Sequence, residues 1–319
     1  MRNFTSVSDV HDVQALVDEA IRMKGTPASH LHQGAGKTLG LIFMNPSLRT
    51  RISTQKAAAN LGMNAMVLNV DKDGWALEFE EGAIMNGNTV EHVKEAAAVM
   101  GAYCDIIGIR CFPGLKNREE DDAEIVLNQF MRYAGVPVIS LESATLHPFQ
   151  SLADMITLHE NWNSPGKKPK VVLSWAPHIK PLPQAVANSF SEWTLAAGFD
   201  LTITHPKGLE LPERFTKGAH IVHDQNEALQ GADFIYVKNW SSYTNYGKVH
   251  EAPEWMLREE KLKHCALGKI MHCLPVRRNL ELSDDLLDSN RSLVIQQAEN
   301  RVWSAQVVLK NILSNLNPA

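Results

Sequence analysis

Short runs of apolar, mostly β-branched residues alternate along the chain with longer stretches whose apolar positions recur at helical spacing. In the first half, the pattern predicts strands over residues 39–44, 65–70, 105–110 and 136–141, and helices near residues 53–61, 90–103 and 122–134. In the second half, it predicts strands over residues 170–175, 201–204, 234–237, 270–273 and 293–296. Such alternation is typical of parallel sheets with crossover helices. The sequence therefore predicts an α/β fold with two doubly wound parallel-sheet domains.

A boundary is expected near residue 150. An apolar-periodic helix over residues 152–162 is followed by the turn-rich stretch Asn163-Ser-Pro-Gly-Lys-Lys-Pro-Lys. We therefore expect one domain over residues 1–150 and a second over residues 151–297. The last helix, residues 298–319, has apolar positions at helical spacing and is expected to pack against other elements.

Composition excludes several classes of protein. With 319 residues, 44% hydrophobic and 21% charged, the chain has a globular composition, and its net charge of -5 argues against a nucleic-acid or anionic-membrane partner. No apolar run approaches the roughly 20 residues of a spanning helix, and the N-terminus lacks a signal-peptide core. The four cysteines form no C-x-x-C pair, so they are expected to be reduced in a cytoplasmic protein.

The segment Ser47-Leu48-Arg49-Thr50-Arg51 is the strongest candidate for binding chemistry. It connects a buried strand to a helix, whose N-terminus offers unpaired N–H groups and the positive end of the helix dipole. Arginine binds phosphate through two parallel hydrogen bonds. A solvated helix start with surface arginines is the alternative, but two arginines and a threonine in one turn favour an anion site.

Other motifs carry less weight. Gly34-Ala-Gly36-Lys37-Thr38 resembles the end of a P-loop, but residue 31 is Leu where that motif needs Gly, and the lysine precedes a strand. His30 with His32, and His264 with Cys265, lack further ligands at a recognisable spacing, so no metal site is expected. The chain has neither G-x-G-x-x-G after a strand nor G-x-S-x-G, which argues against dinucleotide oxidoreductases and α/β-hydrolases.

Polar residues follow other predicted strands. Arg110 and His147 lie at or beyond strand ends in the first half, where open α/β sheets bind ligands. In the second half, His178, Lys238 and His272-Cys273-Leu274-Pro275 with Arg277 and Arg278 occupy equivalent places. Three cationic groups in this second set suggest a second anionic ligand.

Taken together, the ordered motifs resemble the transcarbamylase family across nearly the whole chain. They are Phe43-x-x-Pro-Ser47-x-Arg49-Thr50-Arg51, Arg110, His147-Pro-x-Gln150, His272-Cys-Leu-Pro275 and Glu299-Asn300-Arg301. The segments after His178, Lys238 and Pro275 resemble the branch that acts on N-acylated ornithines, and the Asp-x-x-x-Ser-Met-Gly segment expected for free ornithine is absent from the sequence.

The resemblance implies a site for carbamoyl phosphate. Its phosphate would be held by Ser47, Leu48, Arg49 and Thr50, with Trp75 arriving from a neighbouring subunit. The residues around the carbamoyl group would be Thr50, Arg110, His147, Gln150 and Arg301. Among these, Arg110, His147 and Thr50 would stabilise charge on the carbonyl oxygen as the amine attacks. Phosphate would accept the amine's proton, so no cofactor and no metal is expected.

The resemblance also implies an acceptor site. Glu142, His178, Lys238 and Arg277 would bind the acylated amino acid, and the carbonyls of Cys273 and Leu274 would position the attacking amine. Acetylornithine enzymes carry Glu where this chain has Val90 and Lys where it has Glu281. A glutamate would repel a succinyl carboxylate. We therefore predict N-succinylornithine as the acceptor in arginine biosynthesis, with N-acetylornithine as the alternative.

Three further expectations come from the resemblance. The family implies a homotrimer with active sites shared between subunits, a last helix that returns to the first domain, and a deep knot involving residues 179–184 of the second.

A binding protein for anionic small molecules without catalysis is the non-enzyme alternative. It would share the basic crevice but would have no reason to place oxyanion donors beside a phosphate site.

Overall fold

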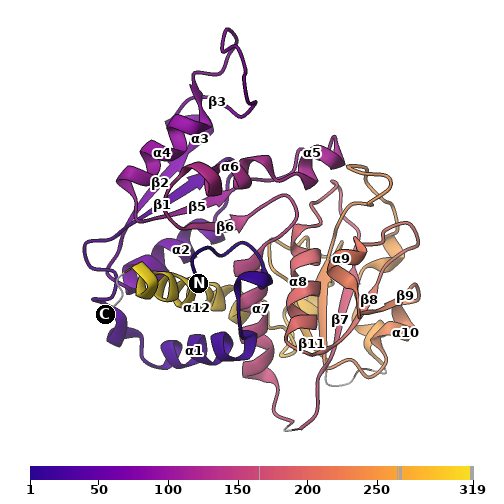
Figure 1. The fold of residues 1–319 in the computed structure, drawn as a ribbon. Helices are drawn as coiled ribbons and strands as arrows, with labels where there is room; N and C mark the ends of the chain where they lie inside the picture. Colours follow the sequence, from indigo (N-terminus) through magenta and orange to yellow (C-terminus); the bar gives the residue numbers. More distant parts are fainter. Residues whose placement is uncertain (165, 264, 266–267, 317–319) are drawn as a thin grey trace. The chain divides into compact units, whose positions relative to one another are not determined.

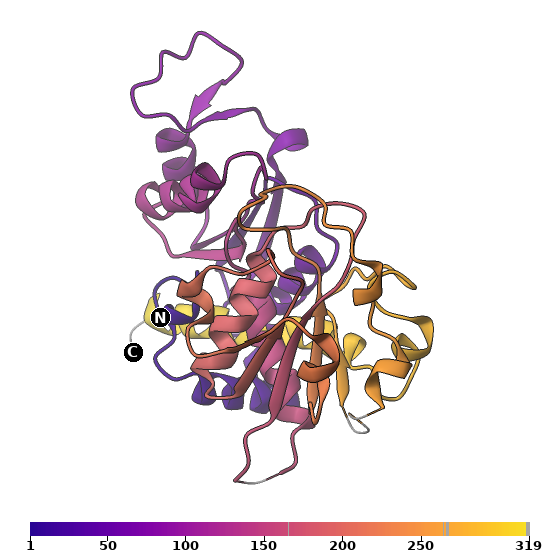
Figure 2. The same cartoon turned by 90° about the vertical axis from the view of Figure 1, so that its right-hand side faces the viewer.

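The computed structural model describes residues 1–164, 166–263, 265 and 268–316 (Figures 1 and 2). His264, considered above as a metal ligand, and residues 317–319 of the predicted last helix lie outside this part of the chain. The chain divides into two compact units. The first comprises Met1–Gly114, Glu119–Phe149 and Arg301–Ala319, and the second comprises Leu115–Arg118 and Gln150–Asn300.

A four-stranded parallel sheet forms the centre of the first unit. Its strands, in spatial order, are β2 (Asn64–Asn69), β1 (Thr38–Phe43), β5 (Ile106–Arg110) and β6 (Val138–Glu142). All residues of β5 and β6 are buried. β5 is a central strand, whereas β6 lies at the end of the sheet, where Phe4 bridges to Ile139 and covers it. Because the strands are parallel, their carboxyl ends meet at one edge.

Helices pack around this sheet. They are η1 (Val7–Asp9), α1 (Val13–Gly25), η2 (Pro27–His30), α2 (Arg49–Asn60), α3 (Val70–Asp73), α4 (Val93–Tyr103), α5 (Arg118–Asp122) and α6 (Ile125–Tyr133). The last turns of α12 (Val294–Leu316) also belong here, beside α1 and α2 (Figure 1). Side-chain hydrogen bonds join Asn60 to Gln306 at 2.8 Å and Asn311 to Glu19 at 2.9 Å. These hydrogen bonds join the C-terminal helix α12 to α2 and α1.

A two-stranded arm extends from the first unit. It contains β3 (Leu77–Glu78) and β4 (Glu91–His92), and both views show it reaching beyond the four-stranded sheet (Figures 1 and 2). Trp75 and Val90 lie on this arm, 54% and 63% exposed. The backbone N–H of Val90 donates to Ala76 O at 2.9 Å, which places the two exposed side chains in neighbouring segments.

The second unit is built on a five-stranded parallel sheet. Its order is β11 (Lys269–Met271), β10 (Phe234–Lys238), β7 (Lys170–Trp175), β8 (Asp200–Thr204) and β9 (His220–Val222). The helices that accompany it are α7 (Pro148–Asn161), α8 (Ala185–Ala196), α9 (Glu213–Thr216), α10 (Gln225–Leu229), η3 (Pro253–Trp255), η4 (Glu259–Leu262) and α11 (Asp284–Leu287). The predicted α/β class with two parallel sheets is confirmed.

Several predicted elements differ from the structure. The predicted strand over residues 293–296 is wrong, because α12 begins at Val294 after a single bridge between Ser292 and Ile270. A short apolar run does not distinguish a strand from a buried helix. The predicted helix over residues 122–134 is interrupted at Glu124, whose φ is 49°. Strand β9 was not predicted, because it is short and largely exposed.

Candidate active site

The loop after β1 ends at the first turn of α2 and forms the centre of the candidate site. Ser47 Oγ accepts a hydrogen bond from the Thr50 N–H at 3.3 Å, and Leu48 occupies the N-cap position without a capping side chain. Arg49 is half-buried at the first helical position. The helix therefore presents N–H groups and one guanidinium at the same end.

Thr50 is the point at which distant residues converge. Its side chain is buried, and Oγ1 accepts from Arg301 Nη2 at 2.6 Å and from Arg110 Nη1 at 3.4 Å. A hydroxyl has two acceptor lone pairs and one proton to donate. With both lone pairs facing guanidiniums, the Thr50 proton is left to donate to another group. Residues from three separate parts of the sequence thus form one buried cluster.

Strand register brings Arg110 to Glu142 and His147. The pairing of β5 with β6 shifts between Ile109 and Arg110, so that Arg110 lies opposite Glu142. Arg110 Nη1 forms an ion pair with Glu142 Oε2, and His147 Nε2 lies 3.3 Å from the same oxygen. Glu142 was predicted to bind the acceptor. In the first unit it partners Arg110 and His147, and its acceptor role stays a prediction.

His147 is neutral in this environment. The side chain is buried, and burial together with the charges of Arg301, Arg110 and Arg49 holds its pKa well below the ordinary value. Its Nδ1 is buried and has no hydrogen-bond partner in the described part of the chain. The imidazole can therefore take part in hydrogen bonding without adding another positive charge.

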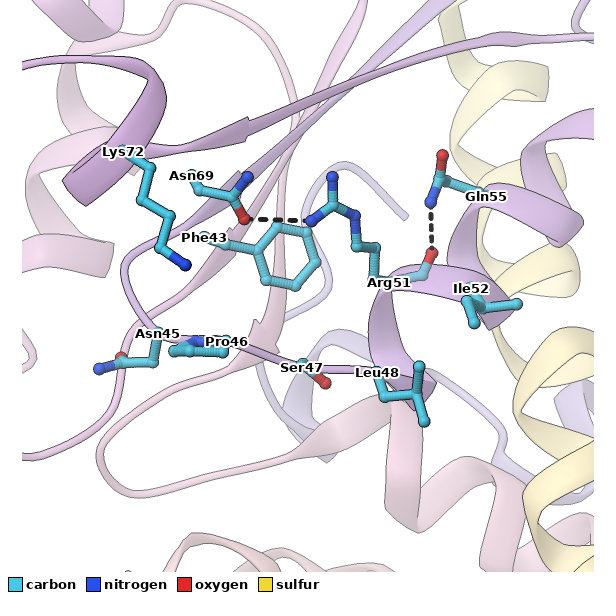
Figure 3. Close-up of a pocket in the computed structure, with 10 residues that line it drawn as sticks. All are labelled: Phe43, Asn45, Pro46, Ser47, Leu48, Arg51, Ile52, Gln55, Asn69 and Lys72. Carbon is cyan, nitrogen blue, oxygen red and sulfur yellow. Dashed lines mark hydrogen bonds between the residues drawn. The ribbon is translucent and has the colours of Figure 1, made fainter.

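A pocket of about 470 Å³ opens at the loop that leads into α2 (Figure 3). Its lining comes from the end of β1, the start of α2 and the segment after β2, and consists of Phe43, Asn45, Pro46, Ser47, Leu48, Arg51, Ile52, Gln55, Asn69 and Lys72. Arg51 Nη1 donates to Asn69 Oδ1 at 3.2 Å, which orients its guanidinium along one wall. Trp75 is not among these lining residues, and its Nε1 donates to Glu91 Oε2 at 2.9 Å.

Lys72 was missed by the sequence reasoning. It lies in the Asp71-Lys-Asp-Gly-Trp stretch, in which only Trp75 was singled out. The signal for it was available, because this stretch follows β2, which pairs with β1 and ends at the same edge of the sheet.

In the second unit, the predicted acceptor residues occupy the carboxyl ends of three adjacent strands. His178 follows β7, the buried Lys238 ends β10, and His272, Cys273 and Leu274 follow β11. Arg277 Nε donates to His178 Nε2 at 3.1 Å, and His178 Nδ1 lies 2.9 Å from Lys180 O and 3.1 Å from Lys180 N. The structure brings these groups together at one edge of the sheet.

A buried carboxylate organises the loop after β11. Glu281 is 1% exposed; it lies 3.3 Å from His272 Nε2 and accepts from the Arg277 N–H at 2.8 Å. Burial raises its pKa, but His272, Lys238 and the Arg277 N–H outweigh this effect and lower it to about 2. His272 Nδ1 accepts from the Leu274 N–H at 2.9 Å, so the ring proton lies on Nε2, facing Glu281.

Two of the residues singled out in the sequence, Gln150 and Arg278, contact side chains close to them in the sequence. Gln150 is buried and donates to Asp154 Oδ1 at 2.8 Å within α7. Arg278, expected above to contribute to a second anion site, is exposed and forms ion pairs with Asp284 at 2.9 Å and Asp288 at 2.7 Å. Hydrogen bonds from its guanidinium to these carboxylates raise the Arg278 pKa further above its ordinary value.

Comparison with known proteins identifies the class. Residues 2–160 match the aspartate/ornithine carbamoyltransferase carbamoyl-P binding domain, and residues 183–312 match the Asp/Orn binding domain of the same family. The chain belongs to the aspartate/ornithine carbamoyltransferase family and is a carbamoyltransferase. The enzyme prediction is confirmed.

Individual relatives narrow this assignment. The chain is 48% identical to N-succinylornithine carbamoyltransferase of Bacteroides fragilis (strain 638R), over 99% of this chain and 100% of the relative. It is 36% identical to N-acetylornithine carbamoyltransferase of Xanthomonas campestris pv. campestris, over 89% of each chain. A crystal structure of a Glu-to-Val mutant of N-acetyl-L-ornithine transcarbamylase, complexed with carbamyl phosphate and N-succinyl-L-norvaline, is also similar. It has a TM-score of 0.91 and 34% identity, and the match covers 98% of this chain and 100% of that one.

None of the helices in the described part of the chain is both long and apolar enough to cross a membrane.

Proposed function

We propose that this enzyme transfers the carbamoyl group of carbamoyl phosphate to the terminal amine of N-succinyl-L-ornithine. The products are N-succinyl-L-citrulline and phosphate, in arginine biosynthesis. One observation supports the carbamoyl phosphate site: Arg110 and Arg301 converge on Thr50 at the start of α2, the helix that begins at Arg49 directly after the loop with Ser47. This is a preorganised arrangement of donors beside an anion site.

The donor half of the reaction follows from these groups. The phosphate of carbamoyl phosphate would bind the N–H groups at the start of α2 with Ser47 and Arg49. The carbamoyl oxygen would then lie near the Thr50 hydroxyl, whose proton is free to donate because both lone pairs face guanidiniums. Arg110 and the neutral His147 would complete the environment of that oxygen, and Gln150 would contact the carbamoyl group.

Attack by the neutral terminal amine builds negative charge on the carbamoyl oxygen. Charge then passes to the departing phosphate, which Arg49 and the helix N-terminus stabilise. The amine's proton can move to phosphate, so no side chain needs to act as a dedicated base. Residues of the first unit thus hold the leaving group and the carbonyl.

The acceptor half is assigned to the second unit and to the arm. We place the α-carboxylate and acyl group near His178, Lys238 and Arg277, with the carbonyls of Cys273 and Leu274 directing the amine. Glu142 would help to orient the acceptor through its contacts with Arg110 and His147. Val90 is expected to face the acyl tail, where it would leave space for a succinyl group.

Three observations favour succinyl over acetyl. Valine at position 90 adds no charge beside the acyl tail, and the relative with 48% identity is named for the succinylated substrate. Mutants of N-acetyl-L-ornithine transcarbamylase in which one glutamate is replaced by Ala, Val, Pro or Ser have been crystallised with N-succinyl-L-norvaline, which supports a succinyl ligand where that carboxylate is absent. N-acetylornithine remains the second candidate, because relatives with 36% identity are named for it.

We further propose a homotrimer in which the exposed arm, with Trp75, completes the site of a neighbouring subunit. The support is that Trp75 and Val90 are exposed on an arm that extends from its own unit. Within the chain, the Trp75 indole contacts Glu91 rather than the phosphate loop.

One assay tests the proposal. The enzyme is incubated with carbamoyl phosphate and, separately, N-succinylornithine, N-acetylornithine or ornithine, and the ureido product is measured. We expect the highest kcat/KM with N-succinylornithine. Preference for the acetyl compound would overturn the choice of acceptor.

A matched pair of variants tests the mechanism. Thr50→Val keeps the shape of the side chain but removes the hydroxyl, and Thr50→Ser keeps the hydroxyl. Loss of one oxyanion donor should lower kcat by about 10² to 10³ in the valine variant. The serine variant should stay close to wild type. Equal turnover in both variants, with folding verified by circular dichroism, would remove Thr50 from the mechanism.

A further inference from the structure

A second group of ligand-type side chains lies in the second unit, apart from the residues assigned to the reaction. His205 directly follows β8, His223 directly follows β9, and Glu210 lies on the loop between β8 and α9. Each offers one nitrogen or carboxylate oxygen, and these atoms lie within 4.8 Å of one another. Neighbouring strand ends therefore bring together two imidazoles and one carboxylate that are distant in sequence.

Backbone hydrogen bonds fix both imidazoles in the form that binds metals. His205 Nδ1 lies 2.8 Å from Pro206 O, and His223 Nδ1 lies 3.0 Å from His205 O. A carbonyl oxygen can only accept, so each Nδ1 carries the proton and each Nε2 keeps its lone pair. Among the residues described, neither Nε2 has a hydrogen-bond partner. Metal-binding histidines are commonly oriented by such a bond from the other ring nitrogen.

The carboxylate is oriented as well. Glu210 Oε1 accepts from the Gly208 N–H at 3.0 Å, which holds the carboxylate in place. His205 is buried, whereas Glu210 and His223 are exposed, so the group has one anchored ligand and an open side toward solvent. An incoming ion would need little rearrangement of the backbone.

We propose that His205, Glu210 and His223 form a binding site for a divalent transition metal ion of the Zn²⁺ type. Two imidazoles and one carboxylate suit Zn²⁺, whereas Ca²⁺ and Mg²⁺ prefer oxygen ligands throughout. Water would fill the remaining position on the open side. No metal was expected above, both from the spacing of other histidines and because carbamoyl transfer needs none. Sequence spacing does not bring these three residues together.

Such an ion would stabilise a loop that supports the end of β10. Trp240 Nε1 donates to Leu209 O at 2.8 Å, and Ser242 Oγ donates to Gly208 O at 2.6 Å. These bonds join the loop that carries Glu210 to the segment directly after Lys238. The proposed site lies outside the carbamoyl-transfer chemistry, and its existence does not depend on which acceptor the enzyme uses.

The test measures zinc binding directly. Enzyme stripped of metal with a chelator is dialysed against buffered free Zn²⁺, and bound metal is counted per chain. Glu210→Gln and His223→Ala change exposed residues and should fold normally. His220→Ala is the matched control, since His220 is an exposed histidine on the same strand, β9, but outside the cluster.

We expect one Zn²⁺ per chain in wild type and in His220→Ala, and affinity at least tenfold weaker in the two cluster variants. Zinc should also raise the melting temperature of the wild type and the control, but not that of the cluster variants. The proposal is overturned if wild type retains no zinc at micromolar free concentrations. It is equally overturned if the cluster variants bind as tightly as wild type, or if His220→Ala loses binding with them.

Discussion

At the residue scale, Thr50 links residues that we propose bind carbamoyl phosphate. Its hydroxyl accepts from Arg110 and Arg301, two guanidiniums that would otherwise be buried side by side near Arg49. Like charges at such short range repel, and a shared acceptor with an anionic ligand offsets that repulsion. The Glu142 carboxylate beside Arg110 lowers the positive charge further. The cluster is thus arranged for a ligand that carries negative charge.

Val90 provides the first prediction. Val90→Glu would place a carboxylate where the succinyl carboxylate is expected, and repulsion between two charges about 4 Å apart costs about 1 to 4 kcal/mol, depending on solvent exposure. We expect kcat/KM for N-succinylornithine to fall by roughly tenfold or more. Steady-state kinetics with both acylated ornithines measures this change.

Val90→Gln is the control, because it has nearly the shape of glutamate without the charge. It should lose much less succinyl activity than Val90→Glu. Unchanged kinetics in the glutamate variant would show that the arm does not approach the acyl tail.

Glu281 provides a prediction about pH. Its folded pKa of about 2 lies below the ordinary value of 4.5, so the ionised carboxylate stabilises the folded state. That contribution is fully present above pH 4.5 and is lost as pH falls toward 2. In Glu281→Gln it is absent, and one oxygen must serve two donors, which costs about 2 kcal/mol at neutral pH.

Urea unfolding of wild type and Glu281→Gln, at several pH values from neutral downward, measures the difference. The gap in unfolding free energy should be widest at neutral pH and should narrow below about pH 4.5. A gap that is constant with pH would mean that the carboxylate charge contributes nothing.

The structure brings Thr50, Arg110 and Arg301 together, but the sequence did not predict all of their partners. The order of Ser47, Arg49, Thr50, Arg110, His147 and Arg301 along the chain was enough to propose a common site. The pairing of Glu142 with Arg110 depends on a register shift between β5 and β6, which spacing does not reveal. Lys72 and the His205 group depend on which strands are neighbours in the sheet.

At the scale of elements, α4 and α6 approach so closely that only glycine fits between them. A Cβ on Gly101 of α4 would lie 1.8 Å from the carbonyl oxygen of Ala134, at the end of α6. Alanine normally stabilises a helix by about 1 kcal/mol relative to glycine. Here the obstacle is backbone, so Gly101→Ala should destabilise the fold by about 1 to 3 kcal/mol.

Gly25→Ala is the matched comparison, because a Cβ at the end of α1 meets nothing within 4 Å. We expect this variant to be as stable as wild type or slightly more so. Chemical denaturation of both variants measures the free energies. If Gly101→Ala matches Gly25→Ala in stability, the two helices can separate without cost.

Helices and strands with a strong apolar pattern were predicted close to their observed bounds, and short elements and helix ends were not. The central strands have continuous apolar sequences, so β1, β5 and β7 fall close to their predicted ranges. The start of α12 was mistaken for a strand because its apolar run is short, and only Ser292, before the helix, forms a bridge to β11. Glu124 breaks a predicted helix because its carboxylate accepts from the Thr145 N–H at 2.8 Å, a tertiary contact.

At the scale of the whole molecule, the proposed trimer makes a prediction that a single chain does not. If Trp75 serves a neighbouring subunit, Trp75→Ala and Arg49→Ala damage different halves of a shared site. Each variant alone should have little activity.

In mixed trimers, some sites combine an intact Arg49 with an intact Trp75, and random mixing gives about a quarter of all sites this composition. Coexpression of the two variants should therefore restore roughly a quarter of wild-type kcat per site. Arg49→Ala coexpressed with Ser47→Ala is the control, because both changes lie in the same phosphate loop, so every site contains one of them. Recovery in the first pair alone supports shared sites. Absence of recovery in both pairs, with mixed trimers verified by mass spectrometry, would place Trp75 and Arg49 in the same site of one chain.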